Sequence, residues 1–284
     1  MPVFPSRITR SFALACLLTP AFMQAQTSLS KSWTILKSGL EDKKMENRQT
    51  AVRLLGMLPG NDQAAELAIK ALADEDSDVR EAATEALTSL KAPSAKNKLH
   101  DIIQTDKDPA VVLGAARALL AMDDPFGYGV FYAVLTGEKK SGEGLMEEQK
   151  KMLKDPKKLT RFGFEQGVGF VPFGGIGLTL VKSLTKDDVS PVRAAAAKIL
   201  AADPDVKSLA ALEEATGDNS WIVQVAAIAA IAQRNDQTTM STLELRLTDP
   251  KEAVQYTAAA AIIHLNDVKD IKSEKPAPAK RPRR

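Results

Sequence analysis

Cysteine, histidine and aromatic residues are scarce in this chain of 284 residues, which has one Cys, two His and 5% aromatics. A single cysteine, Cys16, allows neither a disulfide framework nor a thiolate zinc site within one chain. The two histidines, His100 and His264, lie far apart in the sequence, and no nucleophile, base and orienting acid form a local motif. We therefore expect a non-enzyme with no catalytic residue, no metal site and no cofactor.

The chain also lacks an excess of charge of either sign. Lys and Arg together number 38 and Asp and Glu 36, which leaves a formal net charge of +2. This net charge is too small to imply a nucleic-acid binder for the whole chain, and we expect no specific nucleic-acid partner. A basic, proline-rich cluster ends the sequence, and residues 267–284 have few apolar side chains to bury. We predict a disordered tail over 267–284 with weak affinity for anionic surfaces.

No apolar run is long enough to span a bilayer comfortably. The run from Ser11 to Met23 falls short of the ~20 residues that a spanning helix needs. Arg7 and Arg10 precede it and Ala25 follows it, an arrangement typical of a secretory signal. Residues 1–25 are therefore predicted to be a signal peptide, with a mature chain that is periplasmic or secreted. A lipoprotein signal at Cys16 is the disfavoured alternative, because the apolar run continues past the cysteine.

What the chain does have is a recurring helical pattern. Between residues 76 and 90, apolar residues follow the spacing of one buried helical stripe, and Asp76 and Asp78 stand where they can cap the helix. The same pattern recurs at intervals of 32, 32, 81, 31 and 31 residues, around Asn47, Val79, Val111, Val192, Val223 and Val254. A fixed period near thirty residues indicates an array of structural repeats.

Each of these helices follows a shorter amphipathic segment, so each repeat is predicted to be a pair of antiparallel helices. We predict an all-α solenoid over residues 26–266, with about seven helix pairs and an irregular segment at 125–186. In that segment the fourth pair is degenerate, a glycine-rich insertion follows it, and Ile176–Lys186 forms the leading helix of the fifth pair.

The insertion has an unusual composition. Residues 167–180 include no charged side chain, and five glycines surround Phe170 and Phe173. Glycine at this density disfavours an isolated helix but permits close approach of two backbones. We expect Phe170 and Phe173 to be buried at a tight helix crossing. The alternative is a surface that contacts a partner or a membrane, which would make the protein a membrane-associated scaffold.

Two of the repeats resemble a known family. Asp78-Val79-Arg80-x-Ala82-Ala83-x-x-Ala86-Leu87 and Val192-Arg193-Ala194-Ala195-x-x-x-Ile199-Leu200 resemble HEAT repeats, closest to the short bacterial form also found in phycobilisome bilin lyases. The resemblance covers residues 30 to 266 approximately. It implies a right-handed superhelix whose second helices line the concave side, with proteins as the usual ligands.

The same resemblance implies a ladder in which an Asp before one second helix pairs with an Arg, such as Arg80 or Arg193, of the neighbouring repeat. Val112, Gln224 and Gln255 replace that arginine, so we expect interruptions in the third unit and the last two. HEAT-repeat di-iron hydroxylases carry His-Glu pairs. Because Asp101 follows His100 and Leu265 follows His264, that metal site is not expected. A bilin-lyase-like or other enzyme-associated factor is the alternative function.

The face opposite the anchor stripe changes along the array. In the second unit it is polar, with Glu81, Thr84, Glu85 and Thr88, and in the last two it is apolar. An exposed apolar face would mark a site for a partner helix or peptide, whereas contact with neighbouring helices would make the same residues core. We predict an exported, non-enzymatic scaffold that binds a protein or peptide on its concave face. The predicted contacts are Val225, Ile228, Tyr256 and Ile263, with a polar rim of Arg193, Lys198 and Gln224.

Overall fold

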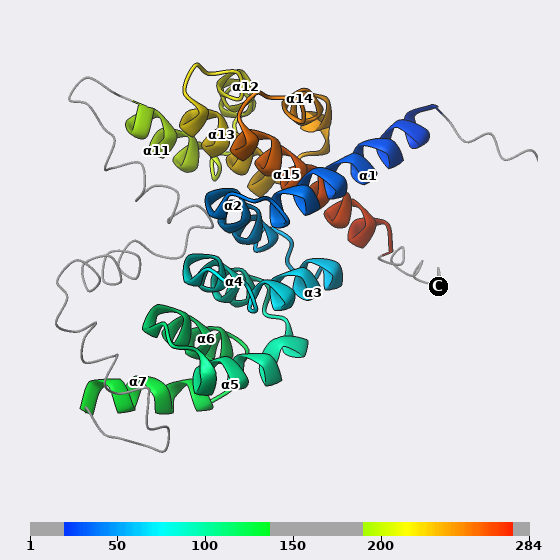
Figure 1. Ribbon diagram of the computed structural model, residues 1–284. Helices are drawn as coiled ribbons and strands as arrows, with labels where there is room; N and C mark the ends of the chain where they lie inside the picture. The colour runs from blue at the N-terminus through cyan, green and yellow to red at the C-terminus, as the bar shows by residue number, and fades with distance from the viewer. Residues whose placement is uncertain (1–19, 137–189, 275–284) are drawn as a thin grey trace, which may run out of the picture.

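The computed structural model describes residues 20–136 and 190–274, and Figure 1 shows how their helices are arranged. Every regular element in these two ranges is a helix, which confirms the all-α prediction. The glycine-rich insertion, with Phe170 and Phe173, lies outside the described residues, as does most of the degenerate fourth pair.

Within the described residues the helices form the expected pairs; the second helix of the fourth pair and the leading helix predicted for the fifth, Ile176–Lys186, lie outside them. The N-terminal half contains α1 (Pro20–Leu40), α2 (Met45–Leu55), α3 (Asp62–Ala71), α4 (Ser77–Leu90), α5 (Lys96–Thr105), α6 (Pro109–Ala121) and α7 (Phe126–Thr136). The C-terminal half contains α11 (Ser190–Leu200), α12 (Val206–Ala215), α13 (Trp221–Arg234), α14 (Met240–Arg246) and α15 (Glu252–Glu274). Short 3-10 turns at Pro93–Ala95 and Gln237–Thr239 precede α5 and α14.

Aspartates shape the turns that separate the helices of a pair. Before α4, the Asp74 carboxylate accepts the backbone N–H of Asp76, and the Asp76 carboxylate in turn accepts the N–H of Asp78. Asp106 and Asp108 repeat this arrangement before α6. These bonds satisfy backbone donors that have no partner within the helix. Each second helix therefore starts at a position that the sequence fixes locally.

The helix pairs are not stacked in chain order throughout. Within the N-terminal half α2, α4 and α6 pack side by side, and within the C-terminal half α11, α13 and α15 do the same. The two halves meet where α15 packs against α1 and α2. The spatial order of the array is thus α11, α13, α15, α2, α4, α6 and α7 (Figure 1). Thr136 and Ser190, which border the undescribed segment, lie at opposite ends of this array.

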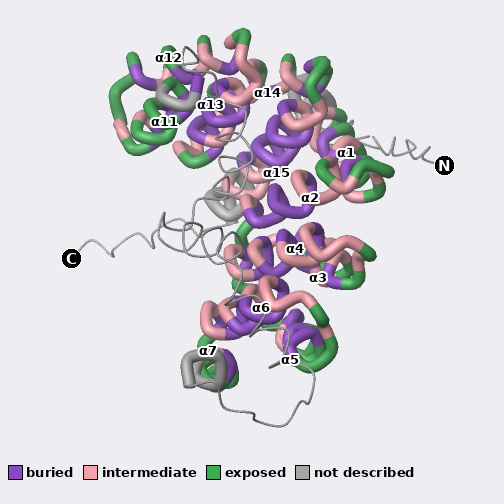
Figure 2. The backbone as a smooth tube through the Cα atoms, turned by 60° about the vertical axis from the view of Figure 1, so that its left-hand side comes forward, coloured by how far each residue is buried: buried purple, intermediate pink, exposed green. Residues whose placement is uncertain are grey.

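We call the contact of α15 with α1 and α2 the seam. Its apolar part is continuous with the core of both halves, and Figure 2 shows buried stretches on α15 and α2 where the two helices lie near each other. Tyr256 of α15 is only 4% exposed. Gly39 of α1 makes this approach feasible, because a Cβ atom there would lie 2.9 Å from both Ala51 Cβ and Tyr256 Cζ.

Polar contacts border the seam. Ser28 Oγ donates to Glu244 Oε1 at 2.5 Å, and Asn61 Nδ2 donates to Asp267 Oδ2 at 2.8 Å. Burial of the Tyr256 hydroxyl raises its pKa, and the nearby carboxylates of Asp42 and Glu252 act in the same direction. These contacts join the first repeat to the last, which the sequence places at opposite ends of the chain.

Two predicted boundaries differ from the structure. The first helix begins at Pro20 and therefore continues through the boundary predicted between the signal peptide and the solenoid at residues 25 and 26. The prediction of a disordered tail from residue 267 is wrong for 267–274, because α15 continues to Glu274. Asp267 anchors this extension through its bond to Asn61. Residues 275–284 lie outside the described residues.

The close approach at Gly39 gives a stability prediction. Gly39→Ala adds a methyl group within contact range of two buried neighbours, and overpacking of this kind costs about 1–3 kcal/mol. This exceeds the ~1 kcal/mol that alanine contributes to helix propensity. We expect a lower free energy of unfolding in chemical denaturation.

Gly129→Ala is the matched control, since Gly129 is also helical and a Cβ there meets nothing within 4 Å. It should leave stability unchanged or raise it slightly. Equal effects of the two substitutions would contradict the packing described for the seam.

Candidate functional site

The four apolar residues predicted to bind a partner lie in the core. Val225, Ile228, Tyr256 and Ile263 are 3%, 0%, 4% and 0% exposed, so the prediction of an exposed apolar groove at these positions is wrong. The cause is packing between second helices, since α13 lies between α11 and α15, and α15 lies between α13 and α2. The face opposite the anchor stripe therefore contacts a neighbouring helix on this side as well.

The second unit follows the same rule. Thr84, predicted to be on a solvated face, is fully buried, because α6 approaches α4 closely at Gly114. A Cβ atom on Gly114 would lie 2.1 Å from Thr84 Oγ1. The change from polar to apolar residues along the array thus reflects how each helix crossing is packed, and it does not locate a ligand site.

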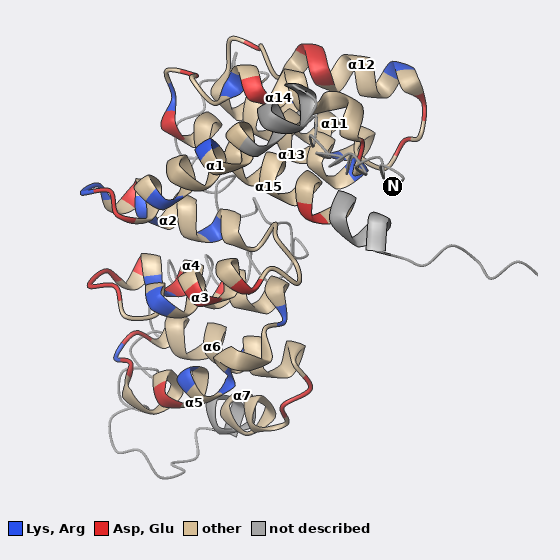
Figure 3. Cartoon of the chain, turned by 90° about the vertical axis from the view of Figure 1, so that its right-hand side faces the viewer, with Lys and Arg blue, Asp and Glu red and all other residues tan. Residues whose placement is uncertain are grey.

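Arginine–aspartate pairs connect neighbouring repeats, as the family resemblance implies. Arg48 donates from Nε and Nη2 to the Asp74 carboxylate at 2.9 and 3.0 Å. Arg80 contacts Asp106 in the same way at 2.6 and 3.0 Å. Figure 3 shows charged residues at the turns of these repeats. The pairs fix the register between units because each is bidentate and only partly exposed.

The ladder affects the ionisation of its carboxylates. Burial of Asp74 alone would raise its pKa, but hydrogen bonds from the Arg48 guanidinium and the Asp76 N–H hold that pKa below its usual value. In the C-terminal half Arg193 pairs with Asp218, while Gln224 Nε2 makes a longer contact of 3.5 Å to Asp249 Oδ2. At Gln224 the predicted interruption of the ladder is therefore a weaker polar contact with Asp249, not a complete loss of contact.

Of the predicted polar rim, Arg193 and Gln224 are thus ladder residues, and Lys198 is exposed on α11. Arg193 differs from the other ladder arginines because its side chain is 47% exposed and borders a pocket. The structure brings Arg193 together with residues that the sequence analysis did not select.

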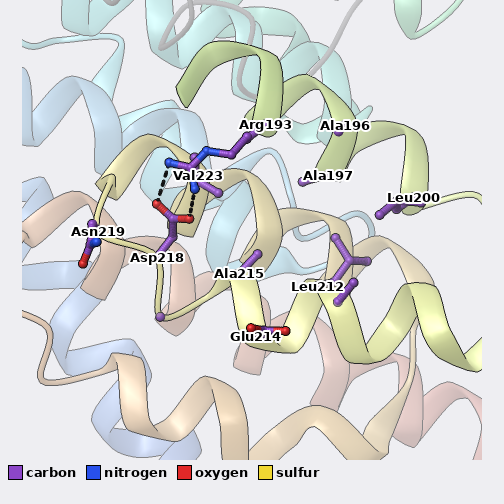
Figure 4. A pocket seen from close by; sticks show the side chains of 12 residues that line it. Arg193, Ala196, Ala197, Leu200, Leu212, Glu214, Ala215, Asp218, Asn219 and Val223 are labelled. Atoms are coloured by element: carbon purple, nitrogen blue, oxygen red, sulfur yellow. Dashed lines mark hydrogen bonds and ion pairs between the residues drawn. The ribbon is translucent and has the colours of Figure 1, made fainter. Parts of the chain in front are cut away.

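This pocket has a volume of about 440 Å³ and lies among α11, α12 and α13 (Figure 4). On one side Arg193 Nη2 lies 3.1 Å from Asp218 Oδ1, and Glu214 and Asn219 also border the opening. The remaining walls are mostly small and apolar, formed by Ala196, Ala197, Leu200, Ala211, Leu212, Ala215 and Val223. The pocket combines an apolar interior with a polar edge fixed by an ion pair.

Two exposed apolar side chains lie on the helices that form the pocket. Ile199 of α11 lies one turn beyond Ala196 and is 74% exposed, and Val206 at the start of α12 is 77% exposed. The sequence analysis did not find this site, because alanines at its positions are equally consistent with the buried stripe of an ordinary helix. One signal was available, since Arg193 and Asp218 are 25 residues apart, close to the separation of 26 for Arg48 and Asp74.

A second pocket of about 530 Å³ lies among α1, α2 and α3, bordered by Lys37, Glu41, Lys70 and Asp74. Its charged groups already have partners. Lys70 lies 3.8 Å from Glu41, Lys37 stands over the Trp33 ring, and Asp74 is held by Arg48. None of the large apolar side chains that are exposed in the described residues lies on α1, α2 or α3, so this pocket is the weaker candidate for binding an apolar anchor.

The two histidines occupy structural positions in different repeats. His100 Nε2 lies 3.2 Å from Asp124 Oδ2 with its ring edge against Phe126, and His264 Nε2 lies 2.7 Å from Asn235 Oδ1. Within residues 20–136 and 190–274, no three histidine, cysteine or acidic residues are grouped so that they can hold a metal ion. No helix in the described ranges combines the length and apolar character needed to cross a membrane.

Comparison with known proteins identifies the family. The family model for HEAT repeats matches residues 34–125 and 178–263, which together exceed half of the chain. The chain therefore belongs to the HEAT-repeat family. No curated protein matches it.

Three similar solved structures have low sequence identity to this chain. Human deoxyhypusine hydroxylase is 14% identical, with 86% of this chain and 99% of that chain covered and a TM-score of 0.33. An engineered protein is 19% identical, with coverages of 83% and 96% and a TM-score of 0.26. A designed armadillo repeat protein is 18% identical, with coverages of 82% and 99% and a TM-score of 0.25.

Proposed function

We propose that this HEAT-repeat protein is an exported, non-enzymatic scaffold that binds a peptide segment of a partner protein in the pocket among α11, α12 and α13. The observation that carries the proposal is the open apolar pocket beside the Arg193–Asp218 pair, together with exposed Ile199 on α11. Repeat solenoids present extended surfaces of this kind to other proteins.

The chemistry of the pocket favours a peptide with an apolar anchor side chain. A volume of about 440 Å³ lies within the range of ~300–1,000 Å³ typical of ligand pockets. Room for the anchor side chain is left by four small residues, Ala196, Ala197, Ala211 and Ala215. Leu200 and Leu212 also line the pocket and supply apolar contact. Burying one Leu- or Phe-sized side chain contributes about 1.5–3 kcal/mol, so affinity also requires contacts at the edge.

The polar side chains at the edge of the pocket can orient a bound peptide. The Glu214 carboxylate and the Asn219 side chain border the opening, where they can accept hydrogen bonds from peptide N–H groups. The Arg193 guanidinium is held by Asp218, so this wall is ordered before a ligand arrives. A preformed wall lowers the entropic cost of binding.

The N-terminal segment of the sequence supports the proposal of export, and the position of α1 is compatible with it. Cleavage near Gln26 would shorten α1 but leave Ser28 and its bond to Glu244 in the mature chain. The seam would therefore remain complete after processing.

Amino-terminal sequencing of the native protein tests this proposal of export. We expect the mature chain to begin near Gln26, because Arg7, Arg10 and the apolar run to Met23 precede small residues. Recovery of Met1 from protein isolated from its natural source would contradict export by a cleaved signal.

Filling the pocket tests the proposed binding site. Ala211→Phe places a large side chain into the pocket from α12, where Ala211 is exposed. The substitution should leave the thermal midpoint within a few degrees and weaken peptide binding at least tenfold. A phage-displayed random peptide library selected against the intact protein supplies the peptides, and calorimetry measures their affinity.

Leu245→Ser is the control, since Leu245 is 68% exposed on α14 and is not a pocket residue. It should leave the affinity of the selected peptides unchanged. Peptides that bind Ala211→Phe as tightly as the unaltered protein would place the binding surface elsewhere.

A further inference from the structure

The two pockets occupy the same position in the repeat. We call the one among α1, α2 and α3 the α3 pocket and the one among α11, α12 and α13 the α12 pocket. Helices α3 and α12 have ten residues each and begin after a side-chain cap, Asn61 or Asp205, so their residues correspond at a constant separation of 144. Five residues from α3 and the turn after it line the α3 pocket, and all five counterparts line the α12 pocket. Three of these pairs are Lys70 and Glu214, Ala71 and Ala215, and Asp74 and Asp218.

The arginine–aspartate ladder borders both pockets in the same way. Arg48 of α2 holds Asp74, and Arg193 of α11 holds Asp218. Four residues after each arginine, a buried apolar side chain of the same helix lines the pocket, Val52 in α2 and Ala197 in α11. The two pockets are therefore built from equivalent parts of two different helix pairs.

The two pockets differ in charge at one equivalent position. Lys70 borders the α3 pocket, and Glu214 occupies the same place at the α12 pocket. Both residues are exposed. Because the ladder arginines neutralise Asp74 and Asp218 alike, a ligand meets a positive charge at this position in one pocket and a negative charge in the other.

Lysines dominate the border of the α3 pocket. Lys37 of α1 is exposed beside it, and Lys70 lies 3.8 Å from Glu41. The side chains of Lys70 and Glu41 are 77% and 75% exposed, and an ion pair with this exposure is weak. A ligand carboxylate can therefore replace Glu41 as the partner of Lys70, with Lys37 as a further cation.

We propose that the α3 pocket is a second peptide site, and that Lys70 and Glu214 give the two sites opposite charge preferences. This inference rests on the function proposed for the α12 pocket. The α3 pocket takes an apolar side chain next to an acidic residue, because Leu40, Val52 and Leu67 line it together with Lys70. The α12 pocket takes an apolar side chain next to a basic residue, because Glu214 borders it. As the weaker site for an apolar anchor, the α3 pocket depends more on charge for its selectivity.

The peptides selected against the intact protein test this inference when their affinities are measured for two filled variants. Ala211→Phe fills the α12 pocket, and Ala73→Phe places the same side chain at an exposed position that lines the α3 pocket. We expect two classes of peptide. Basic peptides should lose affinity for Ala211→Phe by about tenfold or more and keep their affinity for Ala73→Phe, whereas acidic peptides should show the reverse.

Charge reversal tests the two residues that set the preference. Lys70→Glu should weaken the binding of acidic peptides about fivefold, and Glu214→Lys should weaken basic peptides to a similar extent, since each change replaces an attraction by a repulsion. Lys98→Glu is the matched control, because Lys98 is an exposed residue of α5, the next first helix, and lines neither pocket. It should leave the affinities of both classes unchanged.

The second site would be overturned if no peptide is weakened by Ala73→Phe, or if Lys70→Glu has no more effect on acidic peptides than Lys98→Glu. The proposed function fails separately, by the absence of any peptide that Ala211→Phe weakens. If a filled variant does not fold, hydrogen exchange on the unaltered chain replaces it. Acidic peptides must then protect α3 and basic peptides α12, and protection of the same helix by both classes would contradict the opposite preferences.

Discussion

The packing of α15 against α1 and α2 is the interaction on which the rest of the solenoid depends. A repeat cannot bury its apolar surface alone, and each second helix here needs a second helix on either side. The seam supplies that neighbour for α15 and α2 at once, because Tyr256 fills the space that Gly39 leaves open. Without it, Ile263 and Ala51 would border two separate half-arrays with exposed apolar ends.

The seam also determines where the functional surfaces lie. Since the first and last repeats meet in the middle, α7 and α11 occupy the ends of the described array. Exposed apolar residues occur near both of these ends, with Phe126 and Tyr128 on α7 and Ile199 on α11. The pocket beside Arg193 is therefore located where the described array ends. This arrangement favours binding at an end of the solenoid over binding along its middle.

Local features of the structure were predictable from the sequence. The period of 31 to 32 residues located the helix pairs, and the aspartates before α4 and α6 cap as their positions indicate. The Arg80–Asp106 pair was implied by the resemblance to HEAT repeats. All of these depend on residues within one repeat or in the next one along the chain.

Long-range features were not predictable in the same way. A repeat period specifies how neighbours pack, but it does not indicate that the last repeat precedes the first in space. Tyr256 is a core residue for this reason, because α1 and α2 cover it, whereas Ile228 is buried between α11 and α15, which are its neighbours in chain order. The close approach of Tyr256 to Gly39 could not be predicted from the sequence either. A glycine near the end of a helix is common whether or not another helix packs against it.

The most direct test of the seam is a distance between the two ends of the array, measured by pulsed electron paramagnetic resonance. Spin labels are placed at the exposed residues Tyr128 and Ile199 in a chain that carries Cys16→Ser. With α11, α13, α15, α2, α4, α6 and α7 in sequence and ~8–10 Å between neighbouring helices, the account predicts a separation of about 50 Å. Stacking of the repeats in chain order would bring α7 and α11 within about 20 Å of each other, and that shorter distance would contradict the account.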